Sequence, residues 1–368
     1  MDYTAMEQYW IWLSSVEGIG PKRFYQLLTL YGDARGLWDA LAGGMPGNLR
    51  FLDRVAAQNL WSARDEGYFY GVFEALEKKR IRAIPRISEG YPSCLLDIYD
   101  PPVTLYVRGD CPLDGERQFA VVGSRRCTRD GQRAAREFGK ALAEADVTVV
   151  SGLARGIDTC AHEGVLDAHG RTVAVLGCGV DVPYPPENEA LLNAILDNGG
   201  AVISEYRPGA KPTAGNFPAR NRIISGLSRG VLLVEGAKGS GGMITVNHAT
   251  DQGRDVFAVP GSIYSPLSEM PNRLILSGAT PVVSPWDILE YYRWGSRSRP
   301  EDARQKPTVA LEADEEALVE PLRAQELSFD ELAAATGFSA AKLNSLLTML
   351  ELRGIIVKVP GGLYRAYL

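Results

Sequence analysis

The stretch FAVVGSRR, residues 119–126, shows the pattern that predicts the fold of this chain. An apolar run leads directly into Gly123, and a glycine lets the backbone turn sharply out of a strand. Similar short apolar runs recur along the chain, and helical stretches such as 131–144, 157–169 and 187–197 lie between most of them. The strands that we predict are 119–123, 147–151, 172–177, 201–205, 231–235, 256–260 and 281–284. This alternation predicts an α/β domain with a doubly wound parallel sheet over residues 116–292.

The flanking segments predict smaller units. Residues 1–75 predict a small all-α domain with a glycine-punctuated turn, Gly-Ile-Gly-Pro-Lys at 18–22. This turn is similar to a helix-hairpin-helix turn, whose amides can contact a phosphate, but a helical packing module of the sterile-alpha-motif type fits as well. Residues 76–115 are a lead-in segment with one strand near 105–108. Residues 293–313 lack apolar periodicity and predict a linker.

Residues 314–368 predict three helices and a two-stranded hairpin, the outline of a winged helix. Ser328 and Glu331 form a capping-box pattern at the start of the second helix, and Gly337 ends that helix. A third helix is expected from Ser339 to about Leu352. Its residues are mostly apolar, and it contains one Lys and one Glu, which favours packing or partner docking over reading of base edges.

Composition narrows the function classes. The 368 residues carry 39 basic and 45 acidic side chains, a net charge of −6, which excludes a uniformly basic coat but not a basic groove. The five cysteines are scattered without a CxxC pair, and there are three histidines, so no metal site is expected. The N-terminus lacks a signal-peptide pattern and no apolar run approaches 18 residues. We expect a cytoplasmic protein with reduced thiols and no membrane association.

Four loops that follow predicted strands carry the residues expected to bind a ligand. The crevice at the carboxyl ends of parallel strands is where such sheets bind ligands. Glycines in these loops allow backbone amides to approach phosphates, although neither GxxxxGK[ST] nor GxGxxG is present. The candidates in the first two loops are Gly123, Ser124, Arg125, Arg126, Ser151, Gly152, Arg155 and Gly156. In the last loop they are Lys238, Ser240, Gly241 and Gly242.

The third loop suggests the type of ligand. Residues 207–230 hold five basic residues and no acid. An exposed ring at Phe217 among cations is what single-stranded nucleic acid requires, because bases stack on the ring while Arg and Lys hold phosphates. The alternative for Phe217 is a packing role at the start of a helix. The candidates are Lys211, Phe217, Arg220, Asn221 and Arg222, although one of the two arginines can instead pair with Asp158 or Glu205.

On these motifs the chain resembles the bacterial DNA-processing family DprA, also called Smf. The matching segments span about 117–283 in the family's order. They are VVGSRR, SGLARGIDTCAH, VAVLGCGVDVPYPPEN, ISEY, FPARNRIISGLS, VEGAKGSGGMIT, GRDVFAVPG and NRLILSGA. Two departures are Ser240-Gly241-Gly242, where SGS is usual, and the absence of the usual glycine before Asn272.

The resemblance implies a Rossmann-like homodimer without a cofactor that binds single-stranded DNA. It would protect incoming DNA and load a RecA-type recombinase in natural transformation. The family's DNA contacts would map onto Gly123, Ser124, Arg125, the loop 151–156, Phe217, Arg220, Asn221 and the loop 238–242. The rivals are a phosphoribohydrolase-like enzyme and a winged-helix regulator of duplex DNA. The enzyme is disfavoured because His248 stands where the catalytic glutamate is expected.

A homodimer is also expected from the apolar content of residues 259–279. The candidate interface residues are Ile263, Leu267, Met270, Leu274 and Ile275. Apolar residues beyond those needed to cover a sheet edge favour an interface with two-fold symmetry. The alternative is that this segment covers the last strand internally.

Overall fold

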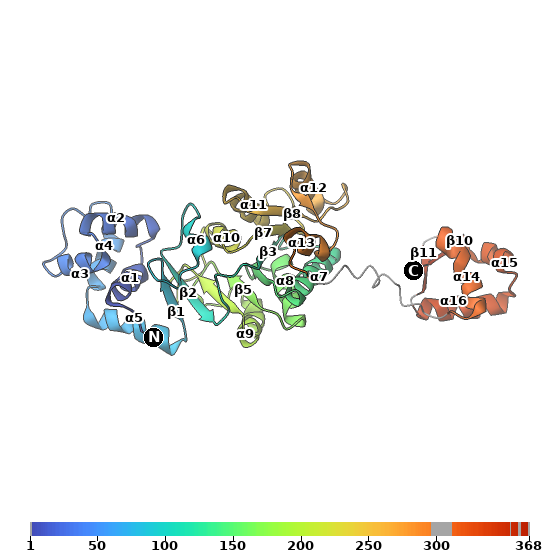
Figure 1. The fold of residues 1–368 in the computed structure, drawn as a ribbon, viewed down its shortest axis with the longest axis horizontal. Helices are drawn as coiled ribbons and strands as arrows, with labels where there is room; N and C mark the ends of the chain where they lie inside the picture. Colours follow the sequence, from blue (N-terminus) through green and yellow to red (C-terminus); the bar gives the residue numbers. More distant parts are fainter. Residues whose placement is uncertain (1, 296–310, 354, 360–361, 367–368) are drawn as a thin grey trace. The chain divides into compact units, whose positions relative to one another are not determined.

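The computed structural model describes residues 2–295, 311–353, 355–359 and 362–366 (Figure 1). The chain divides into two compact units, one within residues 1–295 and one within residues 296–368. Most of the predicted linker, residues 296–310, lies outside the described residues.

A nine-stranded sheet forms the centre of the first unit, in the order β1-β2-β6-β5-β4-β3-β7-β8-β9. Neighbours from β6 to β9 pair in parallel, whereas β1 pairs with β2, and β2 with β6, in antiparallel fashion. The strands are β1 (Arg82–Pro85), β2 (Thr104–Gly109), β3 (Gln118–Val122), β4 (Thr148–Ser151), β5 (Thr172–Val175), β6 (Ala201–Ser204), β7 (Gly230–Leu233), β8 (Asp255–Ala258) and β9 (Thr280–Pro281). The predicted α/β class with a mostly parallel sheet is confirmed.

Helices cover both faces of this sheet. Phe119 and Val121 of β3 pack with α7 (Arg129–Glu144), α8 (Ile157–Asp167) and α13 (Pro285–Tyr292). Ala120 and Val122 point to the other face, which α10 (Asn216–Gly226) and α11 (Gly241–Asp251) cover. Side chains of a strand alternate between faces, so β3 is buried on both sides and reads as a continuous apolar run. The remaining helices around the sheet are α6 (Ser93–Leu96), α9 (Glu189–Asp197) and α12 (Glu269–Leu276), with short 3₁₀ turns at Pro186–Asn188 and Pro266–Ser268.

Five helices precede the sheet and share an aromatic core. They are α1 (Ala5–Ser15), α2 (Pro21–Tyr31), α3 (Ala34–Leu41), α4 (Arg54–Ser62) and α5 (Glu66–Lys78). Helix α1 lies against the antiparallel edge of the sheet, where the Trp10 Nε1 donates to the Val103 carbonyl at 2.9 Å. The helical bundle and the sheet therefore belong to the same unit, and α5 continues past the domain end predicted at residue 75.

The second unit has its own apolar core, which includes eleven buried side chains among its described residues. Its elements are α14 (Ala313–Ala324), β10 (Leu327–Ser328), α15 (Phe329–Thr336), α16 (Ala340–Leu352), β11 (Ile356–Val359) and β12 (Leu363–Ala366), with the strands in the order β10-β12-β11. Ser328 and Glu331 form the predicted capping box, and Gly337 ends α15 with φ of 70°. The winged-helix outline is confirmed, and only the short strand β10 was not predicted.

The lead-in segment contains β1 and α6 in addition to the one strand predicted near 105–108, and several strands end at other residues than predicted. The strand expected at 281–284 stops at Pro281, because Ser284 caps α13 and accepts a hydrogen bond from the Trp286 amide. No helix in the described part of the chain is long and apolar enough to cross a membrane. Nor do the described residues contain a cluster of His, Cys, Asp or Glu suited to a metal ion.

Candidate nucleic-acid interface

The site lies where the order of the sheet reverses. From β3 the chain moves through β4, β5 and β6 on one side, and β7 then pairs on the other side of β3. A crevice opens at the carboxyl ends of the strands at such a point. Here it contains a cavity of about 70 Å³, which we call the switch-point cavity. The predicted candidates that line it are Gly123, Arg125, Phe217, Arg220, Asn221, Gly241 and Gly242.

Two loops are fixed to each other at the mouth of this cavity. The Ser124 amide donates to the Glu235 carbonyl at 2.8 Å. The Glu235 carboxylate accepts from the Thr128 amide at 2.9 Å and from the Thr128 hydroxyl at 2.6 Å. A Cβ on Gly123 would lie 2.7 Å from Ile157 Cγ1, so only glycine fits there. The loops after β3 and β7 therefore form one preorganised wall.

A buried charge cluster forms the floor. Arg220 is 3% exposed, and its Nη1 donates to the Gly152 carbonyl at 2.8 Å. The Gly152 amide in turn donates to Asp158 Oδ2 at 3.1 Å. Burial lowers the pKa of Arg220 to about 10, and burial also raises the pKa of Asp158 although Arg220 opposes that shift. Asp158 therefore holds the loop 152–154 from within the first turn of α8, rather than capping that helix.

Arg125 and Phe217 face each other across the cavity. The Arg125 guanidinium lies 5.7 Å from the centre of the Phe217 ring, in the range of a cation–π contact. The other neighbour of Phe217 is Tyr184, whose ring centre lies 5.0 Å away at an interplanar angle of 31°. Phe217 is half-buried, whereas Arg125 is exposed. The ring is thus less open than the sequence predicts, but it still borders the cavity.

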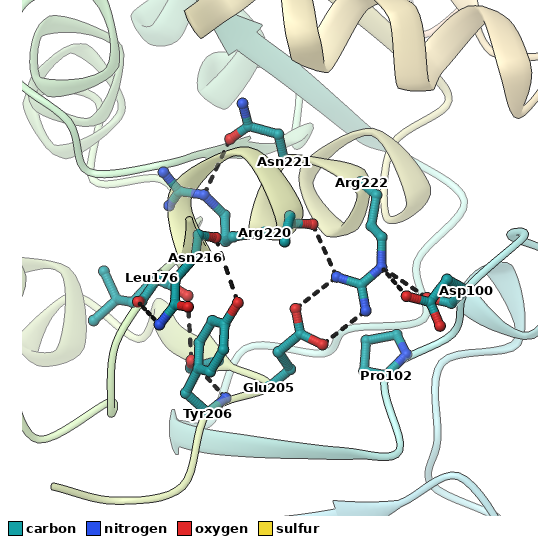
Figure 2. Close-up of polar contacts among 12 residues, drawn as sticks. Asp100, Pro102, Leu176, Glu205, Tyr206, Asn216, Arg220, Asn221 and Arg222 are labelled. Carbon is teal, nitrogen blue, oxygen red and sulfur yellow. Dashed lines mark hydrogen bonds and ion pairs between the residues drawn. The ribbon is translucent and has the colours of Figure 1, made fainter. Parts of the chain in front are cut away.

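Arg222 is not among the residues that line the cavity, and its guanidinium points toward Glu205 and Asp100 (Figure 2). Its Nη1 and Nη2 donate to the two carboxylate oxygens of Glu205 at 2.6 and 2.7 Å, and its Nε donates to the Asp100 carbonyl at 2.7 Å. The side chains of Arg222 and Glu205 are 8% and 9% exposed. Of the two arginines left open by the sequence, Arg222 is the one with a structural carboxylate partner, and its guanidinium is not available to a phosphate.

Backbone donors also face the site. Helices α8, α10 and α11 begin after these loops, and none of the three has a side-chain cap at its N-terminus. The first amides of a helix lack partners within the helix and carry a partial positive charge. Asn221 Nδ2 donates to the Gly241 carbonyl at 3.2 Å and so connects α10 to the start of α11. The first amides of α8 and α10 donate to the carbonyls of Ser124 and Thr213, so the amides of Gly241 and Gly242 at the start of α11 are the better candidates to bind an anion.

Several candidates lie outside the cavity. The Ser151 hydroxyl is fully buried and donates to the Val121 carbonyl at 2.7 Å, which leaves it no role at the surface. Arg155 is exposed but paired with Glu187. Arg126 and Lys238 are exposed near the rim, Ser124 is buried beneath it, and Gly156 approaches the Ser124 carbonyl with φ of 78°. Lys211 lines a separate groove that is described below.

Tyr184 and Glu235 are the site residues that sequence reasoning missed. Both fall within the quoted segments VAVLGCGVDVPYPPEN and VEGAKGSGGMIT, and Glu235 stands directly before the glycine-rich loop. The available signal for Tyr184 was its position between two prolines, and that for Glu235 was its position at the start of a glycine-rich loop. Neither residue identifies its partner, because Tyr184 and Phe217 meet only through the tertiary fold.

The interface candidates after β8 divide into two groups. Ile263 is 82% exposed, whereas Met270 and Leu274 pack against the core beneath them. Asn272 holds the turn at Gly261 through two hydrogen bonds to its backbone, of 3.0 and 3.1 Å. The segment therefore covers the sheet with part of its apolar residues and leaves another part in solvent.

Comparisons with known proteins identify relatives along most of the chain. Residues 82–293 match the family model for DNA recombination-mediator protein A, and residues 302–362 match the DprA winged helix domain. Protein Smf of Escherichia coli is 42% identical over 296 residues, which cover 79% of each chain. DNA processing protein DprA of Streptococcus pneumoniae is 42% identical over 229 residues, 61% of this chain and 80% of that protein.

Two solved structures share the fold. The X-ray structure of DNA processing protein A from Streptococcus pneumoniae superimposes with a TM-score of 0.62 at 34% identity, covering 79% of this chain and 98% of that one. A DNA processing protein A from Helicobacter pylori, described for its single-stranded DNA binding mode, gives a TM-score of 0.53 at 27% identity, covering 58% and 96%.

Proposed function

Because the chain belongs to the DNA recombination-mediator protein A family, we propose that it binds single-stranded DNA at the switch-point cavity. The observation that carries the proposal is the placement of Arg125 opposite Phe217 at the mouth of that cavity. A cation and a ring side by side can hold a phosphate and stack a base. The Helicobacter pylori relative is described as binding single-stranded DNA, which supports the same ligand here.

The resemblance to the DprA family also suggests what happens to the bound DNA in the cell. The bound strand would be protected from nucleases and handed to a RecA-type recombinase in the cytoplasm, during natural transformation or homologous recombination. The proposed direct contacts are Arg125, Arg126, Phe217, Arg220, Asn221 and Lys238, with the amides of Gly241 and Gly242. No catalytic group or cofactor is part of this proposal.

The residues of the winged-helix domain fit the binding of a partner protein better than the binding of duplex DNA. Lys342, the lysine of α16, pairs with Asp314 at 2.6 Å and lies 4.2 Å above the Phe338 ring. A helix that reads the major groove needs free Arg, Lys, Asn or Gln side chains. Of these residue types α16 has only Lys342 and Asn344, and most of its other residues are apolar, so we propose that α16 docks a protein rather than base edges.

The test of the proposed function is a titration of labelled oligo(dT) and a duplex of equal length over a series of salt concentrations. We expect tighter binding of the single strand and a linear fall of log K with log salt, because phosphate contacts release counterions. Equal affinity for single-stranded and duplex DNA, or an affinity that does not change with salt concentration, would contradict the proposal. Release of free base from nucleoside monophosphates would instead favour the phosphoribohydrolase-like enzyme.

Phe217→Ala is expected to weaken binding of single-stranded DNA by about 1–2 kcal/mol, the lower part of the range for a stacked base. The lower part applies because Tyr184 already covers part of the ring. The slope of log K against log salt should stay unchanged, since no charge is removed. Melting temperature measured on the same variant provides the control: early melting with normal binding by the folded protein would show that the ring only packs.

We further propose a homodimer through residues 259–279, with Ile263 as its exposed apolar contact. Ile263→Asp is expected to convert the dimer to a monomer in light scattering, because a desolvated carboxylate is costly at an interface. The control is Leu30→Asp on α2, where the side chain is 48% exposed in the helical bundle. A wild-type protein that is monomeric at micromolar concentration would show that this segment covers only its own sheet.

A further inference from the structure

A groove of about 650 Å³ lies next to the start of α10, with Asn216 in its lining. One wall is the turn between α1 and α2, residues 16–21, with the apolar side chains Val16 and Ile19. The other wall is the loop after β6, residues 205–213. Asn216 lines this groove, and its neighbour Phe217 lines the switch-point cavity. The first turn of α10 therefore borders both spaces, and Figure 2 shows the Tyr206 side chain, from the loop after β6, directed at Asn216 of that turn.

Four charged side chains line the groove, and their partners differ. Glu205 is neutralised by Arg222. Arg207 Nη2 lies 2.7 Å from Glu17 Oε2, and these side chains are 34% and 72% exposed. Lys211 is exposed and forms no ion pair with any residue that the structure describes. With both carboxylates paired, the free charge of the groove is positive.

The Glu17–Arg207 pair joins the helical bundle to the loop of the sheet domain across 190 residues of sequence. A guanidinium recognises carboxylate and phosphate oxygens with the same donor geometry. Because Glu17 is mostly exposed and makes a single contact with Arg207, a phosphate in the groove can replace it at low cost. The carboxylate thus occupies the position that a nucleic-acid phosphate would take.

Building on the proposed function, we propose that this groove binds the continuation of the same DNA strand, with Lys211 and Arg207 as phosphate ligands. Glu17 holds Arg207 until a phosphate displaces it. A strand that leaves the ring of Phe217 passes Asn216 and enters the groove, where Lys211 and Arg207 can hold its phosphates. The helical bundle then extends the DNA-binding site, and Glu17 lowers the affinity for DNA because it competes with phosphate for Arg207.

Oligonucleotides of different length distinguish the contribution of this groove to DNA binding from that of the switch-point cavity. Lys211→Ala and Arg207→Ala are compared with wild type on a series of fluorescein-labelled oligo(dT) strands of increasing length. We expect no change on the shortest strands that bind and about a threefold to fivefold loss on long ones, the size typical of a partly exposed charge contact. The slope of log K against log salt should fall by about 0.7 per removed cation on long strands only. Lys78→Ala, an exposed lysine of α5 outside the groove, is the matched control.

Glu17→Gln gives the decisive result, because a purely structural ion pair predicts weaker or unchanged binding when it is broken. We expect this variant to bind long strands about twofold to fivefold more tightly, and to lose the gain when Arg207→Ala is also present. Glu74→Gln, an exposed glutamate of α5 outside the groove, removes the same charge and should leave affinity within error.

Losses that are equal at every length, or a Glu17→Gln variant that binds no more tightly than Glu74→Gln, would overturn the inference. Either result leaves the proposed function standing as long as wild type binds oligo(dT) and Arg125→Ala weakens that binding. Failure of the proposed function shows itself differently, as a wild-type protein that does not prefer single strands of any length.

Discussion

Glu205→Ala is expected to lower the free energy of unfolding of the first unit by about 3–5 kcal/mol, the usual cost of leaving a buried charge without its partner. Arg222 donates two hydrogen bonds to this carboxylate at 2.6 and 2.7 Å, and 8% of the Arg222 side chain is exposed. Asp100 Oδ2 lies 3.6 Å from the guanidinium and is half-exposed, so it replaces only a small part of the lost contact.

Chemical denaturation followed by tryptophan fluorescence measures this loss. All six tryptophans lie before residue 296, so the signal reports on the unit that contains the ion pair. The surface pair Glu269–Arg273, 3.1 Å long, supplies the control. Glu269→Ala should cost no more than about 1 kcal/mol, because exposed pairs contribute little.

A double variant tests the cause of the loss. Replacing both Glu205 and Arg222 with leucine removes the pair without leaving a buried charge, so it should be less destabilising than Glu205→Ala alone. If Glu205→Ala costs the same as Glu269→Ala, or if the double variant is the least stable of the three, the pair does not carry the energy assigned to it.

The locations of the parallel strands were predictable to within a few residues, because each follows from a local apolar run. An apolar run that stops at a glycine or a serine, as at Gly123 and Ser151, must leave the sheet there, and the alternation with helices then orders the parallel strands. The antiparallel edge was less accessible to prediction. Strand β1 pairs with β2 across a proline-rich segment of the chain, and such pairing depends on tertiary contacts rather than on a local pattern.

The roles of the arginines on α10 show where sequence reasoning stops. Arg220 and Arg222 stand two residues apart in one basic segment, and a helix turns about 100° per residue, so they point to different sides. Arg220 reaches Gly152 and lines the cavity, whereas Arg222 reaches Glu205. The sequence indicates that a carboxylate partner is possible but not which arginine has it, because that choice depends on where β6 ends relative to α10.

Arg125→Ala is expected to weaken binding of single-stranded DNA by about 1.5–3 kcal/mol, a loss of roughly tenfold to 150-fold. Three features of the site lead to this size. Gly123, two residues before Arg125, stands where a side chain does not fit. The backbone of the preceding Ser124 is held by hydrogen bonds with Glu235 and Ile157, and the Arg125 guanidinium faces Phe217 at the cavity. A preorganised cation loses little entropy when it binds a phosphate, so most of the contact energy appears in the affinity.

Arg133→Ala is the matched comparison for Arg125→Ala, because both variants lower the charge of the same segment by one. Arg133 lies on α7 with 77% of its side chain exposed and only a 3.4 Å contact to Asp130. A screened surface charge of this kind should contribute less than about 1 kcal/mol. Titrations of labelled oligo(dT) at one salt concentration measure both variants. If both variants lose the same binding free energy, the DNA is attracted by the overall charge of the protein. A larger loss for Arg125→Ala requires a specific phosphate contact at the cavity, because the two variants remove the same charge from the same segment.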